Sequence, residues 1–416
     1  MFASYRRLFA APGALAFTLS GLLARLSFSM TGVSAVLMVA ARRDSYALAG
    51  AVSAAGVVAV AVGMPLLGRL VDRYGQARVS VPCVLAGVGP MAGLLLCARY
   101  GAPAWTLFVC YPLASVLPNL GGMARARWAH LYADDPEARH TANALEQALD
   151  EVCFMAGPVL GTALCTGLFP EAGLLVGSVL GGGGVLLFAA QRRTEPPVRP
   201  SSTVTEGQAG GVLRVGRLWL LVAVFAATGL LFGSMEVTTV AYADALGQRA
   251  SAGWLLGLVA AGSGLSGFAF GVLRTRIGAA GRLLAGLGVL AGLTLLPLAV
   301  GQAGGGVALL GPALFVVGVA VAPTMVTGMT LVQEVLPAGQ LNEGMGVAVA
   351  GILVGISAGA AGGGALAQHA APGTGYLITA GAALLALAVT TAGYRGLVGP
   401  GARGTTGGGT AARATG

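Results

Sequence analysis

Long apolar runs separated by short polar segments are the main pattern along this 416-residue chain. A helix that crosses a bilayer needs about 20 consecutive, mostly apolar residues. Twelve runs of that kind are present, at about residues 13–40, 46–67, 79–98, 103–124, 142–166, 172–190, 216–241, 252–272, 283–301, 306–330, 342–367 and 374–394. The pattern therefore predicts an all-α membrane protein with twelve transmembrane helices.

Composition agrees with this class of protein. Hydrophobic residues make up 56% of the chain and charged residues only 9%, whereas charged residues are about a quarter of an ordinary soluble domain. The net charge of +9 comes from arginine alone, because the chain contains no lysine. These arginines are spread between the apolar runs, so we expect the lipid bilayer and not a nucleic acid as the surrounding partner.

The arginines also predict an orientation. An even number of spans puts both termini on one side of the membrane. If that side is the cytoplasm, most arginines lie inside and the outer loops keep only Arg42, Arg43, Arg99 and Arg249. By the positive-inside rule we expect a multi-pass protein of the cell (plasma) membrane with both termini cytoplasmic. The first apolar run reaches about Ala40, which is too long for the core of a cleaved signal peptide.

The polar segments divide the chain into domains. Residues 191–215 are rich in Pro, Ser, Thr and Gly and have no apolar period, which is typical of a flexible linker. We expect this cytoplasmic linker to join a bundle over residues 1–190 to a second bundle over residues 216–396. The remaining residues, 397–416, are low in complexity and are predicted to be a disordered cytoplasmic tail.

The two bundles resemble each other in sequence. A shift of 203 positions lays the charged segment Gly68–Gly75 on Gly271–Gly278, which keeps both glycines but has Thr275 in place of Asp72. A shift of 202 positions lays Gly157 and Gly161 on two glycines of the eleventh run, Gly359 and Gly363. Two matches at nearly one offset predict a duplication, and hence two pseudo-symmetric six-helix bundles.

The charged segment carries a resemblance to a known family. The pattern Gly68-x-Leu70-x-Asp72-Arg73-x-Gly75 between the second and third runs, its altered copy after the eighth run, and the six-plus-six layout resemble the major facilitator superfamily. The resemblance covers nearly the whole chain and implies secondary transport through a cavity between the two halves.

This segment departs from the family pattern just after its second glycine. The family has a pair of basic residues there, but this chain has Gln76 and Ala77, with Arg78 as the nearby replacement. We interpret Gly68, Asp72, Arg73, Gly75 and Arg78 as a conformational gating motif. Asp72 would meet an arginine or the positive end of a helix in the other half. Because the copy has lost the acid, a latch on one side only is expected.

A second resemblance lies in the fifth run. Gly157-Pro158-Val159-Leu160-Gly161 is similar to the Gly-Pro-x-x-Gly signature of drug and metabolite antiporters in that family, although Cys153 replaces the family's preceding glycine. Proline bends a helix and glycine permits close helix contact, so a packing kink is the alternative interpretation. In the eleventh run, glycines at every fourth position from Gly351 to Gly363 predict one smooth face for close contact.

Ionisable residues within the runs are candidates for function, because charges at membrane depth are costly. Arg25 lies about 18 Å into the first run at 1.5 Å per residue, and Asp150 lies about 12 Å into the fifth run from the same side. Glu146 and Asp150 share one helix face, and Glu151 is turned by about 100°. If the first and fifth spans are neighbours, as the resemblance implies, Arg25 and Asp150 form a buried pair.

The duplication offers an internal comparison for these charges. The positions of Glu146, Asp150 and Glu151 correspond to Ala348, Ile352 and Leu353, and that of Arg25 to Thr228. The charges are therefore specific to the N-terminal half. Two interpretations stay open: an ion pair that fixes helix orientation, or a carboxylate that exchanges a proton when substrate arrives.

Glu236 stands alone among small and apolar residues near the outer end of the seventh run. The resemblance implies that the first and seventh spans line the cavity, so Glu236 is a candidate to bind a cationic or hydroxylated substrate, or a proton. The alternative is a residue at the cavity edge that is solvated from outside.

No pattern indicates a cofactor, a metal or an enzyme. His130 and His140 lie in the charged segment 125–140, which we expect to be a solvated loop, and they lack metal-site spacing. The glycine-rich runs 181–184 and 304–306 lack the strand-to-helix context of a phosphate-binding loop. Without an ATP-binding module or a nucleophile–base pair, we expect neither a primary pump nor an enzyme.

We therefore expect a monomeric secondary transporter that exports a small amphipathic molecule in exchange for protons by alternating access. The Gly157–Gly161 bend and the scarcity of polar residues within the runs favour export. One alternative is nutrient uptake by proton symport, which would place several Asn, Gln or aromatic residues in the cavity. Another is a receptor or scaffold that keeps the fold without transport.

Overall fold

The computed structural model describes residues 2–198, 212–248, 251–273, 277–371 and 373–398. Within these ranges the regular structure is helical and contains no strand. Thr275, most of the expected linker and most of the expected tail lie outside the described residues.

The helices follow the apolar runs. In the N-terminal half they are α1 (Phe2–Leu8), α2 (Ala14–Arg43), α3 (Tyr46–Tyr74), α4 (Gln76–Arg99), α5 (Trp105–Ser115), α6 (Leu120–Leu131), α7 (Pro136–Gly167) and α8 (Ala172–Ala190). In the C-terminal half they are α9 (Gly216–Ala245), α10 (Ala252–Phe270), α11 (Ala279–Leu293), α12 (Leu295–Gln302), α13 (Val307–Val335), α14 (Leu341–His369) and α15 (Tyr376–Leu397). Short 3₁₀ turns lie at Arg192–Thr194, Val212–Arg214 and Ala338–Gln340.

Twelve helical spans in the described residues are long and apolar enough to cross a membrane. Nearly every span is a single helix, but α5 and α6 together make the fourth span, and α11 and α12 the ninth. The prediction of an all-α membrane protein with twelve transmembrane helices is confirmed.

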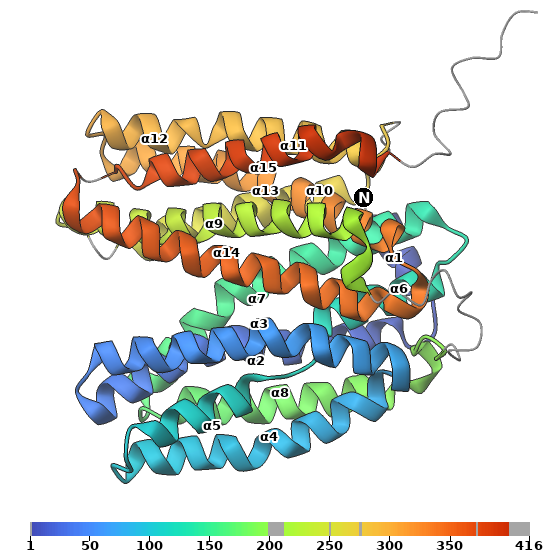
Figure 1. The fold of residues 1–416 in the computed structure, drawn as a ribbon, viewed down its shortest axis with the longest axis horizontal. Coiled ribbons are helices and arrows are strands. Elements are labelled where there is room, and N and C mark those ends of the chain that lie inside the picture. The colour runs from blue at the N-terminus through green and yellow to red at the C-terminus, as the bar shows by residue number, and fades with distance from the viewer. Residues whose placement is uncertain (1, 199–211, 249–250, 274–276, 372, 399–416) are drawn as a thin grey trace, which may run out of the picture.

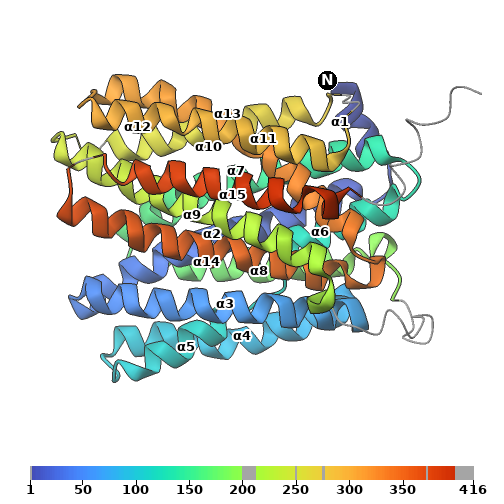
Figure 2. The ribbon, with the colours of Figure 1, turned by 45° about the horizontal axis from the view of Figure 1, so that its top comes forward.

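The helices form two bundles that repeat the same packing. In the N-terminal bundle α2 packs on α7 and α8, and in the C-terminal bundle α9 packs correspondingly on α14 and α15. The bundles meet along two interfaces, α3 with α14 and α7 with α10. Figure 1 shows the blue and green bundle below the yellow and red one, with α14 beside α3. The turned view in Figure 2 keeps the same neighbours.

The two ends of the molecule differ in their charge. Figure 1 places the N-terminus, α1 and α6 at one end, where the α3–α4 turn also lies. Arg6, Arg7, Arg73, Arg78 and Arg192 belong to this end, which we call the arginine-rich end.

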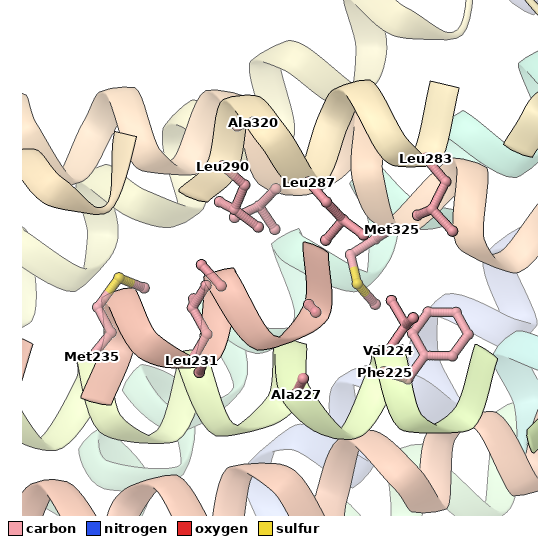
Figure 3. Packing of buried hydrophobic residues seen from close by; sticks show 14 of the residues in the cluster. Val224, Phe225, Ala227, Leu231, Met235, Leu283, Leu287, Leu290, Ala320 and Met325 are labelled. Carbon is pink, nitrogen blue, oxygen red and sulfur yellow. The ribbon is translucent and has the colours of Figure 1, made fainter. Parts of the chain in front are cut away.

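Each bundle has its own apolar core. The largest cluster of buried apolar residues lies wholly between residues 212 and 397. In Figure 3 Phe225, Leu283 and Met325 converge between α9, α11 and α13. A separate N-terminal cluster includes Phe17 and Trp128, whose rings are 4.7 Å apart. Because the clusters of buried residues are separate, each bundle packs around a core of its own.

Glycine faces bring equivalent helices together in both bundles. Side chains added at Gly351, Gly355, Gly359 and Gly363 would all meet α9, several of them its backbone. The predicted smooth face of the eleventh span is thus confirmed. In the other bundle, side chains at Gly157 and Gly161 would meet Ser29, Met30 and Ser34 of α2. The repeated glycines therefore support the same close contact twice, which is what the duplication predicts.

We predict that Gly355→Ala lowers the free energy of unfolding by about 1–3 kcal/mol, because its new methyl group would overlap the α9 backbone at Ala226 and Leu230. The matched control is Gly381→Ala in α15, where a methyl group meets nothing within 4 Å. Thermal unfolding in detergent, followed by tryptophan fluorescence, measures both variants. Equal midpoints for the two would contradict the close contact.

Candidate functional site

The buried charges of the N-terminal bundle meet between α2, α6 and α7. Arg25 on α2 is only 7% exposed. Its Nη1 lies 2.8 Å from Oε2 of Glu146 and 2.8 Å from Oδ1 of Asp150. Glu146 and Asp150 are one turn apart on α7, so one guanidinium reaches both. The structure thus brings Arg25 to the expected Asp150 and also to Glu146.

Arg125 on α6 completes this cluster. Its Nη2 lies 2.9 Å from Oδ2 of Asp150, so each carboxylate oxygen of Asp150 has its own cation. Two arginines and two acids make the four-residue cluster neutral, which reduces the cost of burying charge. We call Arg25, Arg125, Glu146 and Asp150 the charge cluster.

The expectation that residues 125–140 form a solvated loop was wrong. The chain leaves helical geometry after α5 and starts α6 where the side chain of Asn119 accepts a hydrogen bond from Gly122 N, at 3.0 Å. Helix α6 then carries Arg125 and Arg127 into the protein, where they are 4% and 0% exposed. The expected fourth run ended at about residue 124 because the second half of α6 is polar, so a search for apolar runs missed that half. The one available signal was the spacing of Arg125 and Trp128, which share a helix face.

Trp128 holds the fully buried Glu146. Its indole Nε1 donates a hydrogen bond of 2.6 Å to Oε1 of Glu146, while Oε2 faces Arg25. Phe17 of α2 packs against the same indole ring. Glu146 therefore has a fixed position and ties α6 and α7 to α2.

Glu151 differs from the two acids of the cluster. Its Oε1 accepts a hydrogen bond of 3.0 Å from Nε2 of Gln147, and the hydroxyl of Ser263 on α10 lies beside it. Oε1 of Gln147 in turn accepts from Nη2 of Arg125 at 3.4 Å. Among the ion pairs of the described residues none involves Glu151. Glu151 is thus the member of this set that faces the other bundle without a cation.

The equivalent place in the C-terminal bundle is apolar. Thr228 of α9 is buried and donates a hydrogen bond of 2.9 Å back to Val224 O of its own helix. Gly229 lies against the backbone of Ile352 on α14. At this pair of equivalent positions, charged side chains therefore occur in the N-terminal bundle and not in the C-terminal one.

Glu236 does not join the charge cluster. It lies on α9 of the other bundle, and its side chain is exposed. No ion pair or hydrogen bond of its side chain is found among the described residues. It stands as a separate acid in the C-terminal half of α9.

Asp72 joins the two bundles at the arginine-rich end. Its Oδ1 accepts hydrogen bonds from the backbone N and the Nδ2 of Asn342, at 3.1 Å and 2.7 Å. Its Oδ2 accepts from the backbone N of Glu343 at 2.8 Å. These amides belong to the first turn of α14, whose free N–H groups and dipole favour an anion. Of the two expected partners, the structure has the helix end and not an arginine.

The glycines of the gating motif permit this contact. A side chain at Gly68 would overlap the backbone of Asn342 and Glu343. Gly75 has a φ of 97°, which non-glycine residues rarely adopt, and it makes the turn from α3 into α4. Arg73 and Arg78 are exposed, and Arg73 lies over the ring of Tyr74 at 5.3 Å.

Gln76, which departs from the family pattern, has a partner that the sequence did not reveal. Its Oε1 accepts a hydrogen bond of 2.7 Å from Nε of the buried Arg127. Arg127 also donates to Phe188 O at 3.0 Å and to Thr194 Oγ1 at 2.8 Å. A buried arginine on α6 thus holds the start of α4 from inside the bundle.

The other sequence candidates have mainly packing positions. Pro158 lies inside α7, and Gly157 beside it contacts α2. His140 was expected in a solvated loop, but it is half-buried in α7, with its Nε2 at 2.9 Å from Phe270 O of the other bundle. Within the described residues no three His, Cys, Asp or Glu side chains are grouped to hold a metal ion.

Comparison with known proteins finds one relative that aligns with part of the chain, and solved structures that align with most of it. An uncharacterized MFS-type transporter, y4rN of Sinorhizobium fredii (strain NBRC 101917 / NGR234), is 30% identical over 194 residues, which are 45% of this chain and 47% of that relative. The chain thus spans about half the length of this relative.

Solved structures share the fold at low identity. A bacterial homologue of the iron transporter ferroportin in an outward-facing state has a TM-score of 0.72 at 16% identity, over 92% of this chain and 99% of that one. The human organic anion transporter MFSD10 has a TM-score of 0.69 at 17% identity, also over 92% and 99%. The model of one family, the Major Facilitator Superfamily, matches residues 17–343. Twelve spans in two similar bundles and this match over most of the chain show that the protein belongs to the Major Facilitator Superfamily.

Proposed function

We propose that the protein is a secondary transporter that exports a small amphipathic molecule in exchange for protons by alternating access. The observation that carries this proposal is the position of Glu151. This acid lies at the boundary between the bundles, next to the charge cluster on one side and Ser263 of α10 on the other. Rocking of the bundles would change its surroundings, as coupling of proton exchange to movement requires.

The charge cluster supports proton exchange at Glu151 by holding the helices around this acid in place. Asp150 has a cation on each oxygen, and Glu146 is fixed by Trp128 and Arg25. These contacts tie α2, α6 and α7 into one unit. A carboxylate that exchanges protons needs freedom from such cations during part of the cycle. We therefore assign proton exchange to Glu151 and a positioning role to Asp150 and Arg25.

The arginine-rich end would face the cytoplasm of a cell whose plasma membrane holds the protein as a monomer. The hydrogen bonds of Asp72 to α14 lie at this end, as do those between Asn143 of α7 and Gln333 of α13, at 2.9 Å and 3.1 Å. With this end closed, the proposed substrate cavity would open at the opposite end. Glu236, exposed in the outer half of α9, would then meet a cationic or hydroxylated group of the substrate.

Export is favoured over uptake by the apolar character of the spans and by the resemblance of Gly157–Gly161 to the antiporter signature. A substrate screen tests this class of function. Cells with and without the protein are compared for accumulation of amphipathic dyes and drugs, and substrates found are followed in proteoliposomes with an imposed pH gradient. Lower accumulation and proton-driven flux support export. Binding without flux would favour a receptor instead, and inward flux with protons would favour a symporter.

We predict that Glu151→Gln reduces proton-driven flux at least about tenfold, because the amide cannot exchange a proton at this position. Exchange of substrate for substrate, which needs no net proton movement, should persist. The control is Asp134→Asn, an exposed acid between α6 and α7. Unchanged proton-driven flux in Glu151→Gln would refute the assignment.

We predict that Arg125→Met destabilises the protein by about 3–5 kcal/mol, because it leaves a buried carboxylate oxygen of Asp150 without its cation. The double variant Arg125→Met/Asp150→Asn should be more stable than Arg125→Met alone, since the uncompensated charge is gone. Thermal unfolding of the single and double variants measures this coupling. Additive effects would show that the two residues do not act as a pair.

A further inference from the structure

The two interfaces between the bundles are equivalent by the internal repeat, yet they use different chemistry. At the first interface the C-terminal end of α3 meets the first turn of α14, and Asp72 accepts hydrogen bonds from backbone amides. At the second interface the C-terminal end of α10 meets the N-terminal part of α7. The repeat lays Asp72 on Thr275, which lies outside the described residues. Because threonine has no carboxylate, the sequence predicted a latch at the first interface only.

At the second interface, side chains of α7 reach the carbonyl groups at the end of α10. His140 Nε2 lies 2.9 Å from Phe270 O, and the His140 ring packs edge-on against the Phe270 ring at 5.0 Å. Because a carbonyl can only accept, Nε2 carries the hydrogen. The hydroxyl of Thr141 donates to Gly271 O at 2.7 Å. Thr141 is buried, so this bond is shielded from water.

A third donor comes from α1, which is fixed to the N-terminal bundle. The hydroxyl of Tyr5 donates to Phe268 O at 2.8 Å. Leu8 is 1% exposed, and its carbonyl accepts a hydrogen bond of 2.9 Å from the hydroxyl of Tyr132. Tyr5 therefore belongs mechanically to the N-terminal bundle while it contacts the other one.

Helix ends explain why both interfaces are favourable. The first amides and the last carbonyls of a helix lack partners within the helix. Asp72 gives acceptors to the amide end of α14, whereas Tyr5, His140 and Thr141 give donors to the carbonyl end of α10. Both sets of bonds join the two bundles at the arginine-rich end.

We propose that Tyr5, His140 and Thr141 form a second latch that holds the arginine-rich end closed. Asp72 supplies acceptors to the amide end of a helix, whereas this second latch supplies donors to the carbonyl end of one. The proposal rests on the proposed alternating access, for which it names three positioning residues. The second latch replaces the acid that the repeat has lost at Thr275. It uses neutral hydrogen bonds, which are weaker than the charge-assisted bonds of Asp72.

The surroundings of the second latch fit a contact that opens. A cavity of about 290 Å³ lies beside it and is lined from both bundles. Its charged groups are Glu137 and Arg139 of α7, Arg282 of α11 and Glu334 of α13. Asn143 and Gln333 bridge the bundles across the same cavity by a reciprocal pair of amide hydrogen bonds. Separation of the bundles would expose this polar surface to water at little cost.

The test is hydrogen–deuterium exchange of the full-length protein in nanodiscs, with Thr141→Val as the main variant. Valine keeps the shape of threonine but removes the hydroxyl donor. The readout is the distant first turn of α14, where the amides of Asn342 and Glu343 are held by Asp72. Loss of the second latch should speed exchange there roughly three- to tenfold, the range that the loss of one hydrogen bond allows. A local packing role for Thr141 would leave that distant turn unchanged.

Four comparisons make the result decisive. Thr141→Ser keeps the donor and should exchange like the unaltered protein, whereas Tyr5→Phe should behave like Thr141→Val. Exchange in α15 should stay constant in every variant, which excludes general unfolding. Asp72→Asn should speed exchange in segment 268–273 at the opposite interface.

The outcomes separate the latch from the proposed function. If Asp72→Asn acts on segment 268–273 but neither Thr141→Val nor Tyr5→Phe changes the first turn of α14, the second latch is refuted and alternating access stands. If none of the variants acts across the interfaces, the bundles do not open together, and both proposals fail.

Discussion

Polar groups placed between apolar helices have to find partners within the protein, and the arrangement of this molecule depends on that constraint. The clearest case is Asp150, whose two oxygens are each 2.8 Å or 2.9 Å from an arginine. One of those arginines comes from α2 and the other from α6. A charge that no apolar surroundings would tolerate thus fixes three helices relative to one another. Glu151, one residue further along α7, is outside this arrangement and faces the other bundle.

The same constraint acts at the helix ends where the bundles meet. Amides at the start of α14 and carbonyls at the end of α10 lack the usual partner four residues along their own helices. Both sets receive hydrogen bonds from the opposite bundle, although Phe270 O also accepts a local bond from Leu273 N at 3.2 Å. Duplicated bundles need not repeat the residues that make such contacts. They need only supply an acceptor where the helix end donates and a donor where it accepts.

The two bundles have diverged in what they carry. Glycine faces at Gly157 and Gly359 keep the same close contact in each. Beside that contact the N-terminal bundle has Arg25 and Asp150, while the C-terminal bundle has Thr228 and Ile352. Close helix packing is therefore common to both bundles, whereas charged side chains lie beside this contact only in the N-terminal one. This asymmetry is what makes one bundle the candidate for coupling.

The sequence by itself determined the twelve spans, the duplication and the glycine faces, because these follow from hydropathy, helical period and repeat offset. The approach of Arg25 to the acids of α7 was expected from the depth of these charges together with the neighbouring spans that the family resemblance implies. The sequence did not reveal Arg125, Arg127 and Trp128 as buried residues, since the polar second half of α6 looked like a loop. Nor did it indicate that His140 and Thr141 meet carbonyls of α10. Such partners are set by which helix ends come together across the interface. Local sequence does not show which helix ends meet in space, so only the tertiary structure decided these partners.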